Sequence, residues 1–525
     1  MPLSLFGEIA LISSLISVGG LIVGCLWLLA AWLYDSHGLR PLPGPPLAKI
    51  SSAWLGWVAH TGRLNTLIWA QHQKYGKIVR IAPNHVSVVD PNALHTIYGH
   101  GSKALKSEFY DALTQFGGAR SVFTTRSREE HSRKRKFVAH ALSMRSVIEF
   151  EPTIAKYQQL LIDHWDRMCN DAINGLGGKI GEQTWKAKDG QAWMDCMPWL
   201  NFEAFDIIGD LAFGAGFGMV SSGSDLVSVA KSQSRALKSF DTEWQLETET
   251  IPAVKTVLDR SEYTTAAAHL PALVRPLMLL LPNHIRGSTA MKKFGTIAVT
   301  SIAKRLALQS DKVDLLSKMV EVKDDGGRPM GDRELSAEAT TLLIAGSDTT
   351  SNSTCGIVFY LAKDQARQSL LQRELDTALG APTGSGDFNE YGKLYDKVKH
   401  LPYLSAAIEE GLRMYTAVGV GFPRIAPPGG LTILGHTLPE GTVVSVPLYS
   451  LHKDPDIWGP DADKFLPERW LGDDKATWRK AFAPFQVGPR ACIGRNLAYM
   501  ELFTLVATMF HRYHFVLEDP NQEKA

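Results

Sequence analysis

Cys492 is the residue of this chain best placed to do chemistry. Gly488 and Pro489 precede it and favour a tight turn, while an apolar, helix-favouring segment follows at residues 497–510. The sulfur is therefore expected just ahead of a helix N-terminus, where free N–H groups and the helix dipole favour a thiolate by roughly 0.3–1 kcal/mol. Such a thiolate is a soft, electron-rich ligand suited to one axial position of a heme iron. A small buried cysteine without a function is the alternative.

The residues around this cysteine help to decide between a heme ligand and a buried cysteine without a function. Phe485, Gly488, Arg490, Cys492 and Gly494 fit the pattern F-x-x-G-x-R-x-C-x-G, which resembles the heme-binding loop of the cytochrome P450 family. The resemblance implies heme b (iron protoporphyrin IX with an axial thiolate) as the cofactor and Cys492 as the ligand of its iron. It also implies that Arg490 binds a heme propionate, that Phe485 packs beside the sulfur, and that the glycines let the backbone approach the porphyrin.

A second group of polar residues interrupts an apolar helix expected at residues 335–364. Gly346 costs about 1 kcal/mol relative to alanine in a helix interior, and Asp348 is expensive to bury without a partner. Solvent exposure is one explanation, but apolar residues on most faces favour a buried helix. Residues 345–350 resemble the family's [AG]-G-x-[DE]-T-[TS] segment on the oxygen side of the heme. The resemblance implies that Asp348 and Thr349 relay protons and that Gly346 leaves room for dioxygen or substrate.

The densest basic cluster of the sequence lies at residues 129–136. His131 and Arg135 are spaced i, i+4 and so share one helix face, and a guanidinium can bind a carboxylate through two hydrogen bonds. The segment resembles the family helix that contacts the heme propionates, which implies this role for His131 and Arg135 and, by its position, for Arg424. A solvated helix face is the alternative. The neighbouring cations could face an acidic redox partner: Arg133, Lys134 and Lys136.

Glu410, Arg413 and Arg469 are expected to have a structural role. Glu410 and Arg413 are spaced i, i+3 in a helix expected at 401–415, a pairing worth only about 0.2–0.5 kcal/mol by itself. Together with Arg469, in the segment 465–470, they resemble the family's Glu-Arg-Arg network. The resemblance implies that these residues lock the core behind the heme in a buried, fully hydrogen-bonded network.

Most of the remaining chain reads as helix. Apolar residues alternate at 78–81 and 86–89 around a Pro-Asn turn, which predicts a hairpin, and a second hairpin is expected between 432–434 and 443–446. Asp90 followed by Pro91 predicts a helix start. From there to about residue 320 we expect helices, interrupted by loops near 174–190 and 221–224. The fold class is mainly α with small β-sheets, and the resemblance implies the cytochrome P450 fold with an N-terminal transmembrane helix.

The first residues predict a membrane anchor. The run 9–34 carries no charge and exceeds the about 20 apolar residues that cross a bilayer, whereas a cleaved signal peptide would need a basic region before a shorter core. Arg40 and Lys49 after the run favour a cytosolic main body on a single-pass protein, and the resemblance implies the endoplasmic reticulum membrane. Closely spaced prolines then predict a stiff spacer. The expected parts are an anchor and flank at 1–40, a proline-rich hinge at 41–50 and a catalytic domain at 51–525.

Composition argues against several classes of protein. The 525 residues carry 55 Lys+Arg and 54 Asp+Glu, a formal net charge of +1, so nothing favours a nucleic acid as partner. The five cysteines form no CxxC pair, which argues against a disulfide framework or a zinc site and fits a reducing compartment.

The combined motifs imply a membrane-bound eukaryotic cytochrome P450 monooxygenase. Its expected partners are O2, membrane lipid and an NADPH-cytochrome P450 reductase that supplies electrons. One oxygen atom would enter a C–H bond of the substrate, and the other would leave as water. A heme-thiolate isomerase or dehydratase would lack the pair Asp348-Thr349, and a heme sensor would need neither that pair nor a reductase.

Several stretches bear on the substrate because they resemble fungal benzoate para-hydroxylases (benzoate 4-monooxygenases). These stretches are residues 74–85, 106–111, 130–136 and 205–214. They imply para-hydroxylation of benzoate or a related small aromatic acid. Residues 114–125 depart from that subfamily, and Arg120 within them could pair with a substrate carboxylate or be an ordinary loop arginine. Because framework motifs do not encode substrate, hydroxylation of a fungal secondary metabolite from a polyketide or terpenoid pathway is the alternative.

Overall fold

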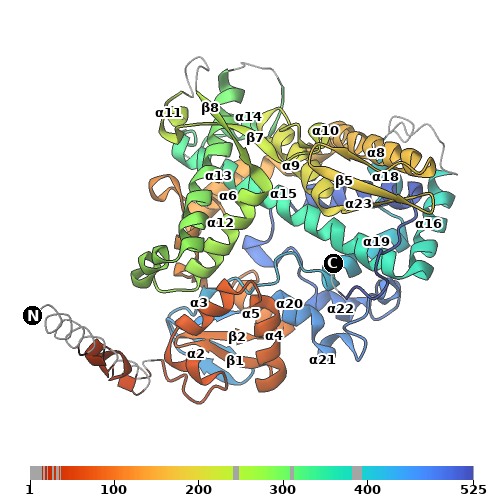
Figure 1. Ribbon diagram of the computed structural model, residues 1–525. Helices are drawn as coiled ribbons and strands as arrows, with labels where there is room; N and C mark the ends of the chain where they lie inside the picture. The colour runs from red at the N-terminus through yellow and green to blue at the C-terminus, as the bar shows by residue number, and fades with distance from the viewer. Residues whose placement is uncertain are drawn as a thin grey trace, which may run out of the picture.

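The computed structural model describes residues 37–239, 247–307, 312–324, 326–380 and 393–523, together with scattered positions between 15 and 35. Helix α15 (Asp332–Lys363) has 32 residues and runs through the middle of the helical part (Figure 1). Asp332 and Glu334 lie in its first turn and Lys363 in its last, where each charge complements the helix dipole. Most of its length is buried, as predicted for the helix at 335–364.

Helix α15 packs in a bundle with α8 (Glu151–Ile173), α9 (Met197–Phe213) and α23 (Arg495–Arg512). α9 approaches α15 so closely that a Cβ on Gly346 would lie 2.7 Å from Ile208 Cγ1. A glycine is therefore required here by helix packing. This corrects the prediction that Gly346 leaves room for dioxygen or substrate, since its open side faces α9.

Two carboxylic acids are buried inside this bundle. Glu203 of α9 is 1% exposed and Glu501 of α23 is 3% exposed. Burial raises the pKa of Glu501 to about 8, although a hydrogen bond with Thr350 of α15 acts in the opposite direction. Burial, and secondly the charge of Glu501, raise the pKa of Glu203 well above its usual range. Burial therefore favours the protonated form of both side chains relative to exposed glutamates.

A five-stranded sheet forms the other end of the molecule, from N-terminal and C-terminal segments (Figure 1). Its strand order is β1 (Ile78–Ala82), β2 (His85–Val88), β12 (Val443–Ser445), β9 (Arg424–Ile425) and β3 (Leu105–Lys106). β1 and β2 form the antiparallel hairpin that the alternating residues predict. The second predicted hairpin is wrong: β12 pairs with β2 and β9, whereas β10 (Leu431–Ile433) pairs with β11 (His436–Leu438).

Smaller sheets lie within the helical part. The segment predicted as a loop near 174–190 is an antiparallel three-stranded sheet of β4 (Gly178–Ile180), β5 (Gln183–Lys188) and β6 (Gln191–Met194). β7 (Leu226–Ala230) and β8 (Thr248–Pro252) form a two-stranded sheet in the region expected to be helical. The mainly α fold class with small sheets is confirmed.

The predicted membrane anchor at 9–34 lies mostly outside the described residues. Within the part of the chain that the structure describes, no helix combines the length and the apolar character that a bilayer crossing requires. The chain after this run is tied to the sheet, because Asp35 Oδ1 lies 3.2 Å from Arg80 Nη2 and the N–H of Arg80 donates to Pro43 O at 2.7 Å. A Cβ on Gly44 would meet Arg80 O at 2.2 Å. The proline-rich segment therefore packs against β1.

Helix α5 (Pro91–Tyr98) begins as predicted, since Asp90 Oδ1 accepts the N–H of Ala93 at 2.8 Å. The remaining described helices, with η denoting 3₁₀ turns, have the following bounds: α2 (Pro46–Ile50), α3 (Ala53–His60), α4 (Leu64–Tyr75), η1 (Glu108–Leu113), η2 (Phe116–Gly118), α6 (Arg128–Ala141), α7 (Met144–Glu149), α10 (Met219–Ser222), α11 (Gln233–Lys238), α12 (Ala253–Ala268), η3 (Ala272–Leu280), α13 (Pro282–Ala307), α14 (Leu315–Glu321), α16 (Gln365–Leu379), α18 (Leu394–Val398), α19 (Pro402–Met414), α20 (Leu448–Lys453), α21 (Pro455–Trp458), η4 (Pro467–Trp470), α22 (Lys475–Ala481) and η5 (Gly488–Arg490).

The buried Glu501 predicts a pH dependence of stability. Its folded-state pKa of about 8 lies above the ordinary value of 4.5, so the folded protein binds the extra proton. The resulting stability is present below the ordinary pKa and is lost as pH rises toward about 8. Glu501→Gln should therefore lose less stability than the wild type between about pH 5.5 and about pH 8.5, measured as the unfolding temperature by circular dichroism. The exposed Glu440→Gln is the control, and parallel pH profiles of wild type and Glu501→Gln would contradict the assignment.

Candidate active site

Cys492 lies in the loop between η5 and the start of α23. Its N–H donates to Phe485 O at 2.8 Å, which closes the turn. Gly488 has φ of 76°, and a Cβ there would lie 2.0 Å from Tyr98 O. The loop therefore needs glycine at this position both for its conformation and for its contact with α5. Cys492 is exposed, so it is not the small buried hydrophobe of the alternative interpretation.

The protonation of Cys492 is set by competing effects. Burial by the surrounding protein raises the pKa of the thiol, whereas the N–H of Gly494 and the guanidinium groups of Arg135 and Arg495 lower it without outweighing burial. The N–H of Gly494 at the helix end favours the thiolate, as predicted, but burial outweighs it in this protein. A coordinated metal ion deprotonates a thiol outright, and a thiol on which two guanidinium groups act suits that chemistry.

Two basic residues face each other across the sheet near this loop. Lys106 of β3 lies directly opposite Arg424 of β9, and the two residues are 3% and 6% exposed. Like charges opposed in this way destabilise a sheet. Arg424 Nη1 donates to Tyr110 Oη at 2.5 Å, and Lys106 Nζ donates to Phe123 O at 2.5 Å. These partners are neutral, so neither side chain is held by an ion pair within the described part of the chain.

Helix α6 and η5 bring further cations to the same place. Arg135 Nη1 of α6 donates to Ala491 O at 3.0 Å and so ties α6 to the cysteine loop. Arg490 Nη1 donates to Thr125 O at 3.0 Å. Burial is the main cause that lowers the pKa of His131 to about 3, and nearby cations add to it, in decreasing order Arg490, Lys106, Arg135 and Arg424. The electrostatic effect of all four on one imidazole places them around it.

We call Lys106, His131, Arg135, Arg424 and Arg490 the basic cluster. Within the described part of the chain, none of its lysine or arginine side chains forms an ion pair with a carboxylate. Glu338 of α15 acts on Lys106 from a distance, but its Oε1 accepts the N–H of Val122 at 2.6 Å. Burying like charges together is costly unless an anion offsets them. The basic cluster therefore fits a ligand with carboxylates, such as the propionates of heme.

Asp348 and Thr349 lie on α15. Thr349 shares a helix face with Ala345, which is exposed in mid-helix, and its Oγ1 donates to Ala345 O at 2.7 Å. Asp348 Oδ1 accepts from Asn352 Nδ2 at 3.1 Å, and Asn352 Oδ1 accepts from Tyr415 Oη at 3.1 Å. Burial raises the pKa of Asp348, and the hydrogen bond from Asn352 acts in the opposite direction. Among the residues that the structure describes, one oxygen of Asp348 is thus held by Asn352 and the other has no hydrogen-bond partner.

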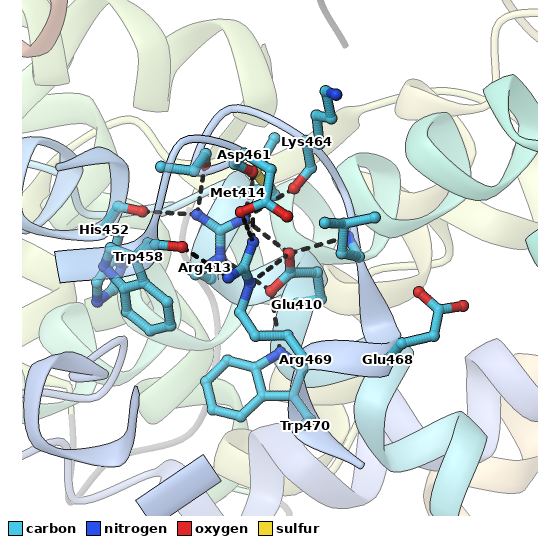
Figure 2. A network of polar contacts seen from close by, with 12 residues as sticks. Glu410, Arg413, Met414, His452, Trp458, Asp461, Lys464, Glu468, Arg469 and Trp470 are labelled. Atoms are coloured by element: carbon cyan, nitrogen blue, oxygen red, sulfur yellow. Dashed lines mark hydrogen bonds and ion pairs between the residues drawn. The ribbon is translucent and has the colours of Figure 1, made fainter. Parts of the chain in front are cut away.

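The structure brings Glu410, Arg413 and Arg469 together (Figure 2). Glu410 and Arg413 are both fully buried, with Nε and Nη2 of Arg413 donating to the carboxylate at 2.9 and 2.7 Å. Arg469 Nε lies 3.6 Å from Glu410 Oε1. Backbone oxygens accept the other N–H groups of Arg413, at 2.7 to 2.9 Å: His452 O, Ala462 O and Lys464 O. This arginine therefore has a partner for each of its charged nitrogens.

Arg120 has a different partner from the one suggested by the sequence. Its Nη2 lies 2.8 Å from Asp111 Oδ1, and its Nη1 donates to Thr124 O at 3.1 Å. Asp111 also binds Arg126 at 2.8 Å. Arg120 is thus compensated by Asp111 of η1 and fits the role of a structural arginine rather than that of a substrate contact.

Sequence reasoning missed several residues of this site. Lys106 follows no motif, because only the register of β3 on β9 places it opposite Arg424. Tyr110 likewise meets Arg424 through the fold alone. Asn352 could have been found, since it stands one helical turn after Asp348, at i+4. Tyr415, which follows α19, reaches Asn352 by tertiary packing.

An exposed cysteine at the start of a buried helix, next to an unpaired basic cluster, defines a heme-thiolate site. The chain belongs to the cytochrome P450 family: the family model described as Cytochrome P450 matches residues 43–525. Heme b is the cofactor of this family, and the chain is a cytochrome P450 monooxygenase. Dependence on a reductase is typical of the family.

Individual relatives come from fungi. Benzoate 4-monooxygenase bphA of Aspergillus niger is 38% identical over 512 residues, which cover 95% of this chain and 92% of the relative. Cytochrome P450 monooxygenase hepC of Aspergillus oryzae is 32% identical and covers 93% of this chain and 90% of its own. Cytochrome P450 monooxygenase atr2 of Stereocaulon alpinum is 31% identical, with coverages of 94% and 88%.

The network around Arg413 predicts a large effect on folding. Arg413→Ala leaves Glu410 charged and buried, which should destabilise the protein by about 3–5 kcal/mol. We expect little soluble, heme-loaded protein, measured as heme absorbance per milligram after purification. Arg328→Ala, which removes an exposed arginine paired with Asp324, is the control and should cost at most about 1 kcal/mol. Normal heme content and an unchanged unfolding temperature in Arg413→Ala would rule out a stabilising role.

Proposed function

We propose that this cytochrome P450 inserts one oxygen atom from O2 into the para C–H bond of benzoate or a related small aromatic acid. The observation that carries the proposal is the similarity, over 95% of the chain, to a protein named benzoate 4-monooxygenase. Relatives named only as monooxygenases share less identity, 31% and 32%, and give no substrate. Hydroxylation of a polyketide or terpenoid is the competing outcome of the experiment below.

In this proposal one set of residues holds the iron of heme and another set holds its propionates. Cys492 would ligate the iron, and Phe485, whose O accepts the cysteine N–H, lies in the same loop. Arg490, Arg135 and Arg424 would bind the propionates, with His131 and Lys106 of the basic cluster beside them. When bound, the heme supplies the redox-active iron at which dioxygen is activated.

The remaining role of the chain is to manage protons on the other side of the site. Thr349 donates its own hydroxyl proton to Ala345 O, which leaves its oxygen lone pairs as acceptors. Asp348 Oδ1 is fixed by Asn352, which leaves Oδ2 to take up a proton and pass it on. Because burial raises the pKa of Asp348, this carboxyl is easier to protonate than an exposed one. Such a pair can supply protons without admitting bulk water.

We also place the protein on the endoplasmic reticulum membrane, with its body in the cytosol and electrons supplied by NADPH-cytochrome P450 reductase. Exposed leucines of η3 support a lipid contact: Leu273 and Leu280 are 89% and 78% exposed. Trp57 of α3 is 60% exposed, and Gly56 beside it packs against Leu270, two residues before η3, since a Cβ on Gly56 would touch Leu270 at 2.5 Å. Exposed apolar surface marks membrane or partner contacts.

Turnover tests the proposed function. Holoenzyme supplied with NADPH, reductase and benzoate should form 4-hydroxybenzoate, quantified by chromatography. Cys492→Ala should lose both this activity and the red-shifted absorbance band of the reduced carbonyl complex. If that band survives in Cys492→Ala, the ligand assignment is wrong. If the wild type converts a polyketide or terpenoid but no aromatic acid, the alternative function is correct.

The proposed proton relay predicts that loss of Thr349 uncouples NADPH consumption from product formation. Thr349→Ala should retain heme and the carbonyl band, but the ratio of product to NADPH consumed should fall roughly tenfold or more as peroxide forms instead. Thr354→Ala is a matched control, because Thr354 makes the same bond to a backbone oxygen of α15, Thr350 O at 2.9 Å. Equal coupling ratios in Thr349→Ala and the wild type would remove Thr349 from the relay.

A further inference from the structure

Arg260 is buried on the inner face of helix α12. It is 8% exposed, and Thr256 and Thr264, one turn before and after it, are 5% and 2% exposed. On the outer face of the same helix Leu258 is 56% exposed, and Glu262 is also exposed. The helix thus buries an arginine and exposes a leucine, which reverses the usual pattern.

Arg260 has no counter-ion in the described ranges of the chain. Its Nε is fully buried and makes no hydrogen bond, and burial is the one cause that lowers its pKa, to about 10. No neighbouring charge contributes to that shift. The hydroxyls of Thr256 and Thr264 donate to backbone oxygens, Pro252 O and Arg260 O. The guanidinium therefore stays charged at neutral pH without an anion to compensate it.

Other buried arginines in this protein are compensated. Arg305, also 8% exposed, lies 2.6 Å from Asp314, and Arg80, 5% exposed, lies 3.2 Å from Asp35. Arg413 is paired with Glu410. A buried charge without a partner is costly. The arginines of the basic cluster also lack a carboxylate partner, and they converge where an anionic cofactor binds. By the same argument, Arg260 fits an anionic ligand.

The inner face of α12 is connected to the candidate active site. α12 packs against η1 and also against α3 and α13, which are labelled beside it in Figure 1. Within η1, Tyr110 binds Arg424 of the basic cluster, and Phe109 contacts the ring of His269, the residue after α12, at 5.1 Å between centroids. The segment that supports the heme side of the site therefore also supports the helix that carries Arg260.

We propose that Arg260 binds the carboxylate of the substrate and thereby selects aromatic acids over neutral analogues. This inference rests on the proposed function and gives Arg260 the role that the sequence suggested for Arg120. A guanidinium holds a carboxylate through two parallel hydrogen bonds, which fixes the direction of the ring. The para carbon is the ring position farthest from the carboxyl group, so an anchored carboxylate presents that carbon first. Arg260 would thus set both the substrate class and the position of hydroxylation.

Paired ligands test this proposal on the heme-loaded enzyme. We titrate two acids and their uncharged methyl esters and follow the spectral shift at the iron. The pairs are benzoate with methyl benzoate, and decanoate with methyl decanoate. Arg260→Gln should weaken benzoate binding by on the order of 30-fold or more, the usual consequence of leaving one partner of a buried charge pair alone. The affinity for methyl benzoate should change by less than about threefold, because the ester carries no charge for Arg260 to bind. Arg260→Lys should recover part of the loss, and Lys255→Gln, on the exposed face of α12, should match the wild type.

Several outcomes separate this inference from the proposed function. If benzoate binds to Arg260→Gln as it does to the wild type while the carbonyl band is intact, Arg260 is not the carboxylate contact and the aromatic-acid function stands. If the wild type prefers decanoate to benzoate and Arg260→Gln loses that preference, Arg260 is upheld and the aromatic substrate is wrong. If the wild type prefers neither acid to its ester, Arg260 does not select carboxylates.

Stability of the ligand-free protein gives an independent readout. Removing an uncompensated buried charge is neutral or stabilising, so Arg260→Gln should unfold at the same temperature as the wild type or at a higher one. Benzoate should raise the unfolding temperature of the wild type more than that of the variant. A lower unfolding temperature of ligand-free Arg260→Gln would show that Arg260 pairs within the protein, and the inference would fail.

Discussion

Repulsion between buried cations is the constraint on which this structure depends. The register of β3 on β9 sets Lys106 opposite Arg424, and Arg135 is held at the cysteine loop by Ala491 O. These positions are fixed by backbone pairing and hydrogen bonds, so the side chains cannot simply move apart. A ligand with carboxylates offsets the repulsion and stabilises the fold by the free energy with which it binds. Folding and cofactor binding are therefore linked in this cytochrome P450.

The protein treats buried arginines in contrasting ways. Arg413 is enclosed by acceptors and reinforces the core behind the cysteine loop, whereas Arg469 of the same network is held to Glu410 only as an ion pair at 3.6 Å and leaves its buried Nε without a hydrogen bond. The arginines of the basic cluster, and Arg260 in α12, have no carboxylate partner among the described residues. An unsatisfied buried charge lowers stability, and it persists where binding a ligand recovers the cost. The distribution of satisfied and unsatisfied arginines thus separates the scaffold from the surfaces that face ligands.

The sequence carried enough information for the parts of the fold that depend on local pattern. The long helices were predicted to within a few residues at α15, α19 and α23, because apolar periodicity and capping residues act within a turn or two. Strand pairing was less accessible: 443–446 was assigned to the wrong partner, and β4 to β6 were expected to be a loop. These pairings join segments far apart in sequence, and short strands have little periodicity of their own. Lys106, whose position opposite Arg424 is set by such pairing, was missed for the same reason.

The ion pair between Asp35 and Arg80 has a mechanical consequence. Asp35 lies at the end of the apolar N-terminal run, and Arg80 belongs to β1, the first strand of a continuous sheet that ends with β9 and β3. A force applied to the chain before Asp35 would therefore act on β1 and, through the hydrogen bonds of the sheet, on Arg424 and Lys106. Displacement of the N-terminal end would thus shift residues that bind the cofactor.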